Sequence, residues 1–312
     1  MLSVPLHGLE RPEEGELVVA PEIAGPGAWS GAPSVVMVGD SLFYLAYRVR
    51  MPLGQGRGVS NVIARSSDGV HFEPVTVLRK DRFGAESLER PALVRTEDGR
   101  WRLFVSCAIP GSKRWRIVVV EAAEPEDLGD PDRSSVRAVL AEYADRAVKD
   151  PVVVHAGGTW HMWVCVHPLD DPGATDRMRT DYGTSTDGLN WTLLRTALAP
   201  RHGQWDSRGA RITAVVLGAD GRPTAAYYDG RSTAEENWEE RVGFAVPMVG
   251  EPGAFVALGA RPIGQSPYGA QGLRYLNVIA RPDGTSRLYY EMTRADGAHE
   301  LRTCVQTAAS AF

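Results

Sequence analysis

The stretch that decides the fold is PALVRTEDGRWRLFVS, residues 91–106. Apolar and β-branched residues lead into Asp98-Gly99, and an alternating run of aromatic and apolar residues follows. Asp-Gly pairs favour the positive φ angles of a tight two-residue turn, so the stretch predicts a β-hairpin. The alternation then places every second side chain on the same face of each strand.

The same layout occurs five times in the chain. The other four segments span residues 33–48, 151–166, 212–230 and 276–292. The second residue of each turn falls at positions 40, 99, 158, 221 and 284, so the steps are 59, 59, 63 and 63 residues. A period near 60 with one hairpin per unit indicates a repeat architecture.

A second turn signal lies between the hairpins. Ser66-Ser67-Asp68-Gly69 and Ser185-Thr186-Asp187-Gly188 each follow a β-rich run and precede an aromatic residue. Each fits a third strand, a turn and a fourth strand. Four antiparallel strands in each of five units predict an all-β protein, a five-bladed β-propeller.

Two other arrangements stay open at this point. A two-sheet sandwich could use the same turns, but it gives no reason for an even period. The stretch 121–148 is rich in Ala, Glu and Arg and could hold a helix, although prolines and glycine interrupt it. We expect only one helical turn near residues 125–128 and an outer strand over residues 136–143.

The expected domain organisation is a single propeller over residues 1–312. Its blades are expected at approximately 29–75, 88–145, 149–195, 206–258 and 271–304, and the N-terminal segment 1–28 is expected to complete a blade.

Composition excludes several classes of protein. The chain has a formal net charge of −5 and is 43% hydrophobic and 23% charged, which is typical of a globular protein and not of a basic nucleic-acid binder. The three cysteines are too few and too scattered for a disulfide framework, so a cytoplasmic location is expected. The first residues do not resemble a signal peptide, and no apolar run approaches the roughly 18 residues of a membrane span.

Propeller geometry concentrates the candidate site at one mouth of the central channel. The innermost strand of each blade lines that channel, so residues about eight positions before each turn should lie at the mouth. These residues are Ala32, Arg90, Asp150, Thr213 and Leu276, with Glu89, Arg208, Arg211, Arg274 and Tyr275 beside them and Asp206 just ahead. Two acids and several arginines are therefore expected together.

The starts of two blades resemble those of a known group of enzymes. Ala32-Pro33-Ser34-Val35, Asp150-Pro151-Val152 and the Ser-x-Asp-Gly-x-x-Trp turn are similar to segments of the five-bladed glycosidases. These are glycoside hydrolase families 43, 32 and 62 and the family 130 mannoside phosphorylases. The resemblance covers nearly the whole chain and implies a carbohydrate-active enzyme that cleaves or phosphorolyses a glycosidic bond in a central funnel. It implies that Asp150 tunes the acid or stabilises the transition state, as its counterpart does in families 43 and 32.

Two positions depart from the pattern of that group. In family 43 an Asp at the start of the first blade is the general base, and this chain has Ala32 there. The family acid is a Glu at the start of the blade after Asp150, where this chain has residues 206–211 without a Glu. Since glycoside hydrolysis usually needs two carboxylates, we expect Asp150 as the main carboxylate, with Glu89 or Asp206 supplying the second function.

The remaining candidates are side chains that could bind a substrate. Guanidinium groups bind carboxylate or phosphate in a bidentate manner, so the arginines suit an anionic group or the phosphate that family 130 enzymes use as nucleophile. A histidine beside acids on a loop suits proton transfer, and an aromatic ring on a loop suits stacking on a sugar. The expected substrate-binding residues are Arg90, Arg208, Arg211, Arg274, Asp229, Glu291, His167 and Trp29.

No cofactor is expected, because the histidines and cysteines lack metal-ligand spacing and no phosphate-binding loop is present. A structural calcium or sodium ion in the channel stays open. The expected partner is a small-molecule or oligosaccharide substrate, with no nucleic acid and no membrane, and the expected state is a monomer. Two other functions also stay open: a sugar-binding propeller without catalysis, which Ala32 motivates, and a propeller recruited to natural-product chemistry.

Overall fold

The computed structural model describes residues 9–307, which form twenty β-strands and four short 3₁₀ turns. The strands make five blades of antiparallel neighbours, and one parallel pairing, of Trp29 in β2 with His299 in β20, joins the first and last blades into one sheet. Blade one contains β2 (Trp29–Val38), β3 (Leu42–Arg50), β4 (Gly58–Ser66) and β5 (Glu73–Arg79). Blade two contains β6 (Ala92–Arg95), β7 (Trp101–Ala108), β8 (Trp115–Ala122) and β9 (Ser134–Leu140). Blade three contains β10 (Arg146–Ala156), β11 (Thr159–Pro168), β12 (Arg179–Ser185) and β13 (Thr192–Leu198).

The last two blades complete the ring. Blade four contains β14 (Gly209–Leu217), β15 (Pro223–Arg231), β16 (Arg241–Pro247) and β17 (Phe255–Leu258). Blade five contains β18 (Leu273–Ala280), β19 (Thr285–Thr293) and β20 (His299–Thr307), and β1 (Glu16–Val19) pairs with β20 on its outer side. Of the segment 1–28 that the sequence assigns to a blade, residues 1–8 lie outside the described part of the chain.

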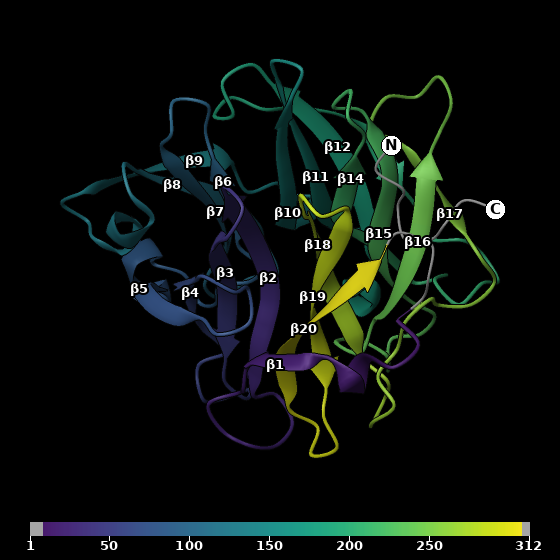
Figure 1. Cartoon of the computed structure of the whole chain (residues 1–312). Coiled ribbons are helices and arrows are strands. Elements are labelled where there is room, and N and C mark those ends of the chain that lie inside the picture. The colour runs from purple at the N-terminus through teal and green to yellow at the C-terminus, as the bar shows by residue number, and fades with distance from the viewer. Residues whose placement is uncertain (1–8, 308–312) are drawn as a thin grey trace.

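The inner strands β2, β6, β10, β14 and β18 lie around the middle of the molecule and each contacts its two neighbours, whereas β5, β9 and β17 lie at the periphery (Figure 1). The prediction of a five-bladed propeller is therefore confirmed, and the sandwich is excluded. The 3₁₀ turn Pro125–Gly129 and strand β9 stand where one helical turn and an outer strand were expected. Within residues 9–307 no helix is long and apolar enough to cross a membrane.

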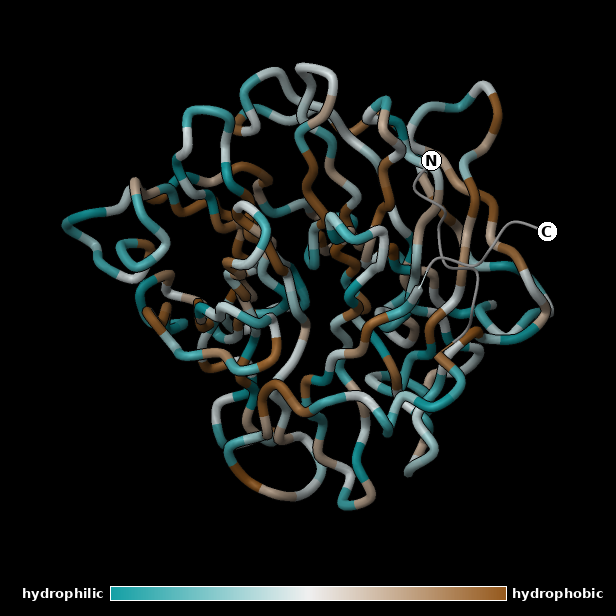
Figure 2. The backbone as a smooth tube through the Cα atoms, viewed as in Figure 1, coloured by the Kyte–Doolittle hydropathy of each residue, from teal (hydrophilic) through white to brown (hydrophobic). Residues whose placement is uncertain are grey.

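The hydrophobic core is divided among the gaps between the blades. Each of the five largest clusters in residues 9–307 contains side chains from two neighbouring blades. Adjacent residues of one strand enter different clusters: Tyr227 packs toward blade five and Tyr228 toward blade three. Figure 2 shows the hydrophobic residues along the strands and the hydrophilic ones mostly in the connecting loops. Apolar packing between blades thus leaves the centre of the ring to other residues.

The Ser-x-Asp-Gly turn has the same hydrogen bonds in blades one and three. In blade one, Ser66 Oγ accepts the N–H of Gly69 at 2.9 Å and Asp68 Oδ1 accepts that of Val70 at 2.8 Å. In blade three, Ser185 Oγ accepts the N–H of Gly188 at 2.9 Å, and Asp187 makes the matching bond at 2.8 Å. This turn therefore orders the outer half of a blade.

Candidate functional site

The inner strands of blades one, three and five change register near their first residues. At that irregularity Ala32, Asp150 and Tyr275 have φ angles of 54°, 56° and 55°, a region that residues other than glycine rarely adopt. All three are buried. They hold equivalent positions, so the fifth-blade residue is Tyr275 and not the expected Leu276. Such strained backbone is often found at functional sites.

Asp150 lies at the centre of a cluster of buried charged residues. Its Oδ1 accepts the N–H of Arg90 at 3.1 Å, and its Oδ2 accepts from Arg211 Nη1 at 3.0 Å and from the Tyr275 hydroxyl at 3.3 Å. The ammonium group of Lys149 is 3.6 Å from Oδ2. Burial opposes ionisation of Asp150, but Lys149 and Arg211 outweigh it and lower the pKa of this carboxyl. Asp150 is therefore held as a carboxylate.

Asp229 shares the same arginine. Arg211 donates to Asp229 Oδ2 from Nη2 at 2.6 Å, and Oδ1 of Asp229 accepts the N–H of Tyr275 at 3.0 Å. Burial raises the pKa of Asp229 to about 6; Arg211 opposes the rise and Glu240 adds to it. Two carboxyl groups on one guanidinium therefore have pKa values displaced in opposite directions. Asp229 was expected as a binding residue, and it lies opposite Arg211 in the β14–β15 hairpin, beyond two register shifts that separate this pair from the turn.

Glu89 and Glu291 meet at Arg48, which bonds Glu89 through Nη1 and Glu291 through Nη2, the latter at 2.9 Å. Arg274 and His299 also bond Glu291, at 2.7 and 2.8 Å. Burial opposes ionisation of both acids, but nearby cations favour it more strongly. The positive charges of Arg48 and Lys149 lower the pKa of Glu89 to about 2. Those of Arg274 and Arg48 hold the pKa of Glu291 well below its ordinary value. Both acids are therefore paired carboxylates.

Sequence reasoning missed Arg48, Glu240 and His299. Glu240 is buried and bonds Arg231 and, at 2.9 Å, Arg274, which joins blades four and five. All three residues lie outside the inner strands, to which propeller geometry assigns the site. The available signal was a charged residue beside or within an otherwise apolar strand, as Arg48 is in β3.

Arg90 connects the inner strands. Its guanidinium donates to the carbonyls of Thr213 at 2.8 Å and of Pro33 and Pro151 at 3.3 Å, and it is 2% exposed. It thus bonds three different blades, and burial lowers its pKa to about 10. Arg90 belongs to the cluster, but its terminal nitrogens are engaged with backbone.

Asp206 and Arg208 lie apart from Asp150. Asp206 accepts from Arg201 and from the Tyr228 hydroxyl, both at 2.8 Å, between blades three and four. Arg208 pairs with Asp176 at 2.7 Å. No bond within the described residues joins Asp206 to the central cluster, so its surroundings suit a structural role.

His167 and Trp29 were both expected on loops, and the structure places them in strands. His167 is next to last in β11, opposite Ala147, and burial together with Lys149 lowers its pKa to about 3. It is therefore neutral. Trp29 is the first residue of β2, and its ring lies 3.9 Å from the Arg50 guanidinium carbon and 4.6 Å from that of Arg274.

The structure thus brings most of the predicted site residues into one cluster and leaves a few outside it. The predicted residues in the cluster are Asp150, Glu89, Arg90, Arg211, Arg274, Asp229, Glu291 and Trp29. In residues 9–307 no group of three or more His, Cys, Asp or Glu side chains is arranged to hold a metal ion.

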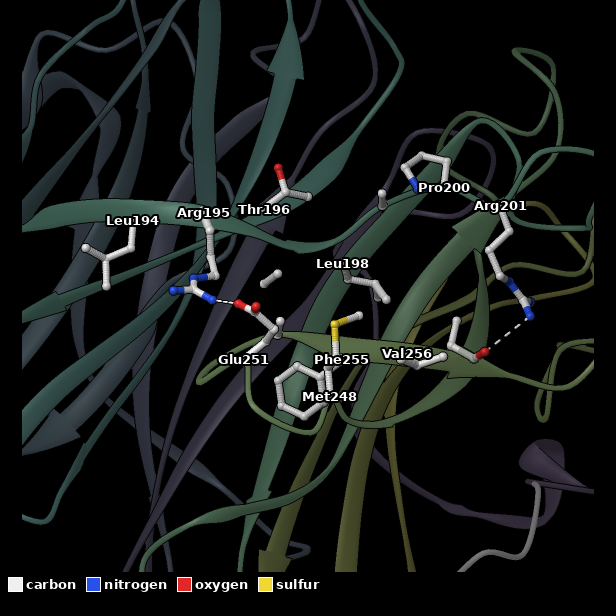
Figure 3. A pocket seen from close by; sticks show the side chains of 14 residues that line it. Leu194, Arg195, Thr196, Leu198, Pro200, Arg201, Met248, Glu251, Phe255 and Val256 are labelled. Atoms are coloured by element: carbon white, nitrogen blue, oxygen red, sulfur yellow. Dashed lines mark hydrogen bonds and ion pairs between the residues drawn. The ribbon is translucent and has the colours of Figure 1, made fainter.

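A separate groove of about 730 Å³ lies between the outer strands β13 and β17 (Figure 3). An ion pair between Arg195 and Glu251 crosses it, and Arg201 donates to the carbonyl of Ala257 at its end. Mostly apolar side chains line it, among them Leu198 and Phe255. It holds one carboxylate, which is engaged with Arg195, and does not suit acid-base chemistry.

Comparisons with known proteins support the fold. No family profile and no curated protein matches the sequence. A glycosyl hydrolase from Bacteroides ovatus has a TM-score of 0.68 at 15% identity, over 97% of this chain and 94% of that chain. A thermostable family-43 glycoside hydrolase has a TM-score of 0.66 at 15% identity, over 95% and 98%. A β-1,2-mannobiose phosphorylase from Listeria innocua has a TM-score of 0.63 at 15% identity, over 96% of both. The chain therefore has the fold of the propeller glycosidases, and the resemblance inferred from the sequence is confirmed at the level of fold.

Proposed function

We propose that the chain is a carbohydrate-active enzyme that cleaves a glycosidic bond at the central cluster. Asp150 is the ionised carboxylate and Asp229 the proton donor. The observation that carries the proposal is the sharing of Arg211 by two carboxyl groups whose pKa values are displaced in opposite directions. Glycoside hydrolysis needs one protonated and one ionised carboxyl group beside the bond, roughly 5–9.5 Å apart, and a single guanidinium bridge suits such a spacing.

Each group has a definite part in the proposed reaction. Asp229 protonates the leaving oxygen, and Asp150 activates water or stabilises the positive charge that develops on the sugar. The Tyr275 hydroxyl orients Asp150. Both carboxyl groups are buried, so the proposal requires neighbouring side chains to move when a small glycoside or an oligosaccharide binds. The many arginines suit a substrate with an anionic group, or phosphate as the nucleophile.

A panel of aryl glycosides, incubated with and without inorganic phosphate, tests the proposal on the full chain. We expect turnover of at least one compound, and a loss of kcat of roughly 100-fold or more in Asp150→Asn and in Asp229→Asn. Asp40→Asn, in an exposed turn, is the matched control and should retain wild-type turnover. Turnover that needs phosphate would identify phosphorolysis. Unchanged kcat in both variants would refute these assignments.

A second candidate is a sugar-binding propeller without catalysis. Ala32 favours it, because it stands in a bulged position equivalent to that of Asp150 and carries no carboxyl group. Sugar binding measured by calorimetry, with no turnover in any condition of the panel, would support this candidate and refute the first.

We also propose that the protein is a cytoplasmic monomer. The support for a cytoplasmic location is that Cys107, Cys165 and Cys304 are free thiols. Light scattering after size-exclusion chromatography and fractionation of the source cells test the two statements.

A further inference from the structure

Arg50, the last residue of β3, is a buried arginine without a carboxylate or carbonyl partner among residues 9–307. It is 3% exposed, and its Nε is buried without a hydrogen-bond acceptor. The other cations of the cluster have partners: Arg90 bonds carbonyls, and the rest pair with carboxylates. Those that pair with carboxylates are Arg48, Lys149, Arg211, Arg231 and Arg274.

The cluster consequently has more cations than carboxylates. It contains seven cations, namely the six just named and Arg50, and six carboxyl groups pair with them. These are Glu89, Asp150, Asp176, Asp229, Glu240 and Glu291. Because burial of an unpaired charge is unfavourable, the pKa of Arg50 is lowered to about 10, chiefly by desolvation. An anion beside Arg50 would reduce this imbalance.

Two tryptophans hold Arg50 in place. Its guanidinium carbon lies 3.9 Å from the ring of Trp29 and 4.7 Å from that of Trp238. Trp238 is 39% exposed and has a φ of 77°, which is strained for an aromatic residue. An exposed aromatic ring therefore stands next to an unpaired guanidinium. This pair suits a ligand that has both an apolar ring face and a carboxylate.

We propose that Arg50, Trp29 and Trp238 form a subsite for an acidic sugar, a hexuronic acid, whose carboxylate is held by Arg50 and whose ring lies against Trp238. The proposal rests on the proposed function, because the subsite adjoins the same cluster. Arg48, two residues earlier on β3, lies 5.3 Å from the Trp29 ring and 5.4 Å from the Tyr275 ring, and the Tyr275 hydroxyl bonds Asp150. Trp29, Arg48 and Tyr275 thus form a chain of contacts from the subsite to Asp150.

Calorimetric titration of the full chain with D-glucuronate, D-glucose and acetate at constant ionic strength tests the subsite. We expect glucuronate to bind at least about tenfold more tightly than glucose or acetate. Arg50→Met should remove this preference, and Trp238→Ala should weaken glucuronate binding at least about tenfold. Arg222→Met is the matched control, because Arg222 is exposed in the β14–β15 turn, and it should bind glucuronate as the wild type does.

Several results would overturn the subsite. They are equal affinity for glucuronate and glucose, acetate binding as tight as glucuronate binding, or an unchanged preference in a folded Arg50→Met. Melting curves establish whether Arg50→Met folds; if it does not, unchanged glucuronate affinity in Trp238→Ala refutes the proposal. Glucuronate binding without turnover of any glycoside refutes the proposed function alone. Turnover of neutral glycosides without a preference for glucuronate refutes the subsite alone.

Discussion

Replacing Asp229 by Asn should change how the stability of the protein depends on pH. Burial raises the pKa of Asp229 from its ordinary value of 3.8 to about 6. The folded state then binds this proton more tightly than the unfolded state, so the free energy of unfolding falls as pH rises through that window. Between about pH 4.5 and about pH 7.5 the loss attributable to this carboxyl group is about 2 kcal/mol. Asn cannot ionise, so Asp229→Asn should lack this loss.

Urea denaturation of the wild type and of Asp229→Asn at both pH values measures the effect. All other titrating groups occur in both proteins, so the difference between the two pH dependences isolates Asp229. The exposed variant Asp40→Asn should show the wild-type dependence. If Asp229→Asn loses stability with rising pH as steeply as the wild type does, Asp229 does not have the raised pKa on which its role as proton donor depends.

Three further perturbations test other parts of the structure. In Gly31→Ala the new Cβ would lie 2.2 Å from Oε2 of Glu291. The Glu291 side chain must then leave Arg48 and Arg274, which should lower the free energy of unfolding by about 3–5 kcal/mol. An unchanged melting temperature would contradict this packing. Tyr228→Phe removes the hydroxyl that bonds buried Asp206 and should cost about 1–3 kcal/mol in urea denaturation, and a smaller loss would show that this bond is dispensable. Burial raises the pKa values of the thiols of Cys107, Cys165 and Cys304 to about 11 or 12. The native protein should therefore react slowly with a thiol reagent at pH 8, and all three thiols should react in urea. Rapid labelling of the native protein would refute this prediction.

The fold could be predicted because its signals are local. An Asp-Gly, Gly-Gly or Gly-Asp pair determines a hairpin within about ten residues, and the even spacing of five such pairs indicates a repeat. The hairpin register then follows from the turn, as it does without interruption from Arg95 opposite Trp101 to Ala92 opposite Phe104. Short-range chemistry thus predicts the order of strands within a blade.

The site could be predicted only in part, because its contacts are long-range. Arg48 and Glu291 are 243 residues apart in the chain and meet only when blade five closes beside blade one. The motif match identified Asp150, but no local pattern distinguishes Asp206, which bonds Arg201 and Tyr228, from a residue of the central cluster. Ring closure decides which charges meet, and a single sequence does not encode it in any short segment.

The distribution of charge within the fold bears on function. Five apolar clusters between the blades already hold the ring together, so stability does not require charged residues at its centre. Buried ion pairs are often no more stabilising than apolar side chains of the same volume. Seven cations and six carboxyl groups nevertheless occupy that centre, and one of the cations, Arg50, has no carboxylate partner among residues 9–307. Such a cluster is poorly explained as a means of stabilising the fold and well explained as a means of binding and protonating a ligand, which favours a functional role for this centre over a purely structural one.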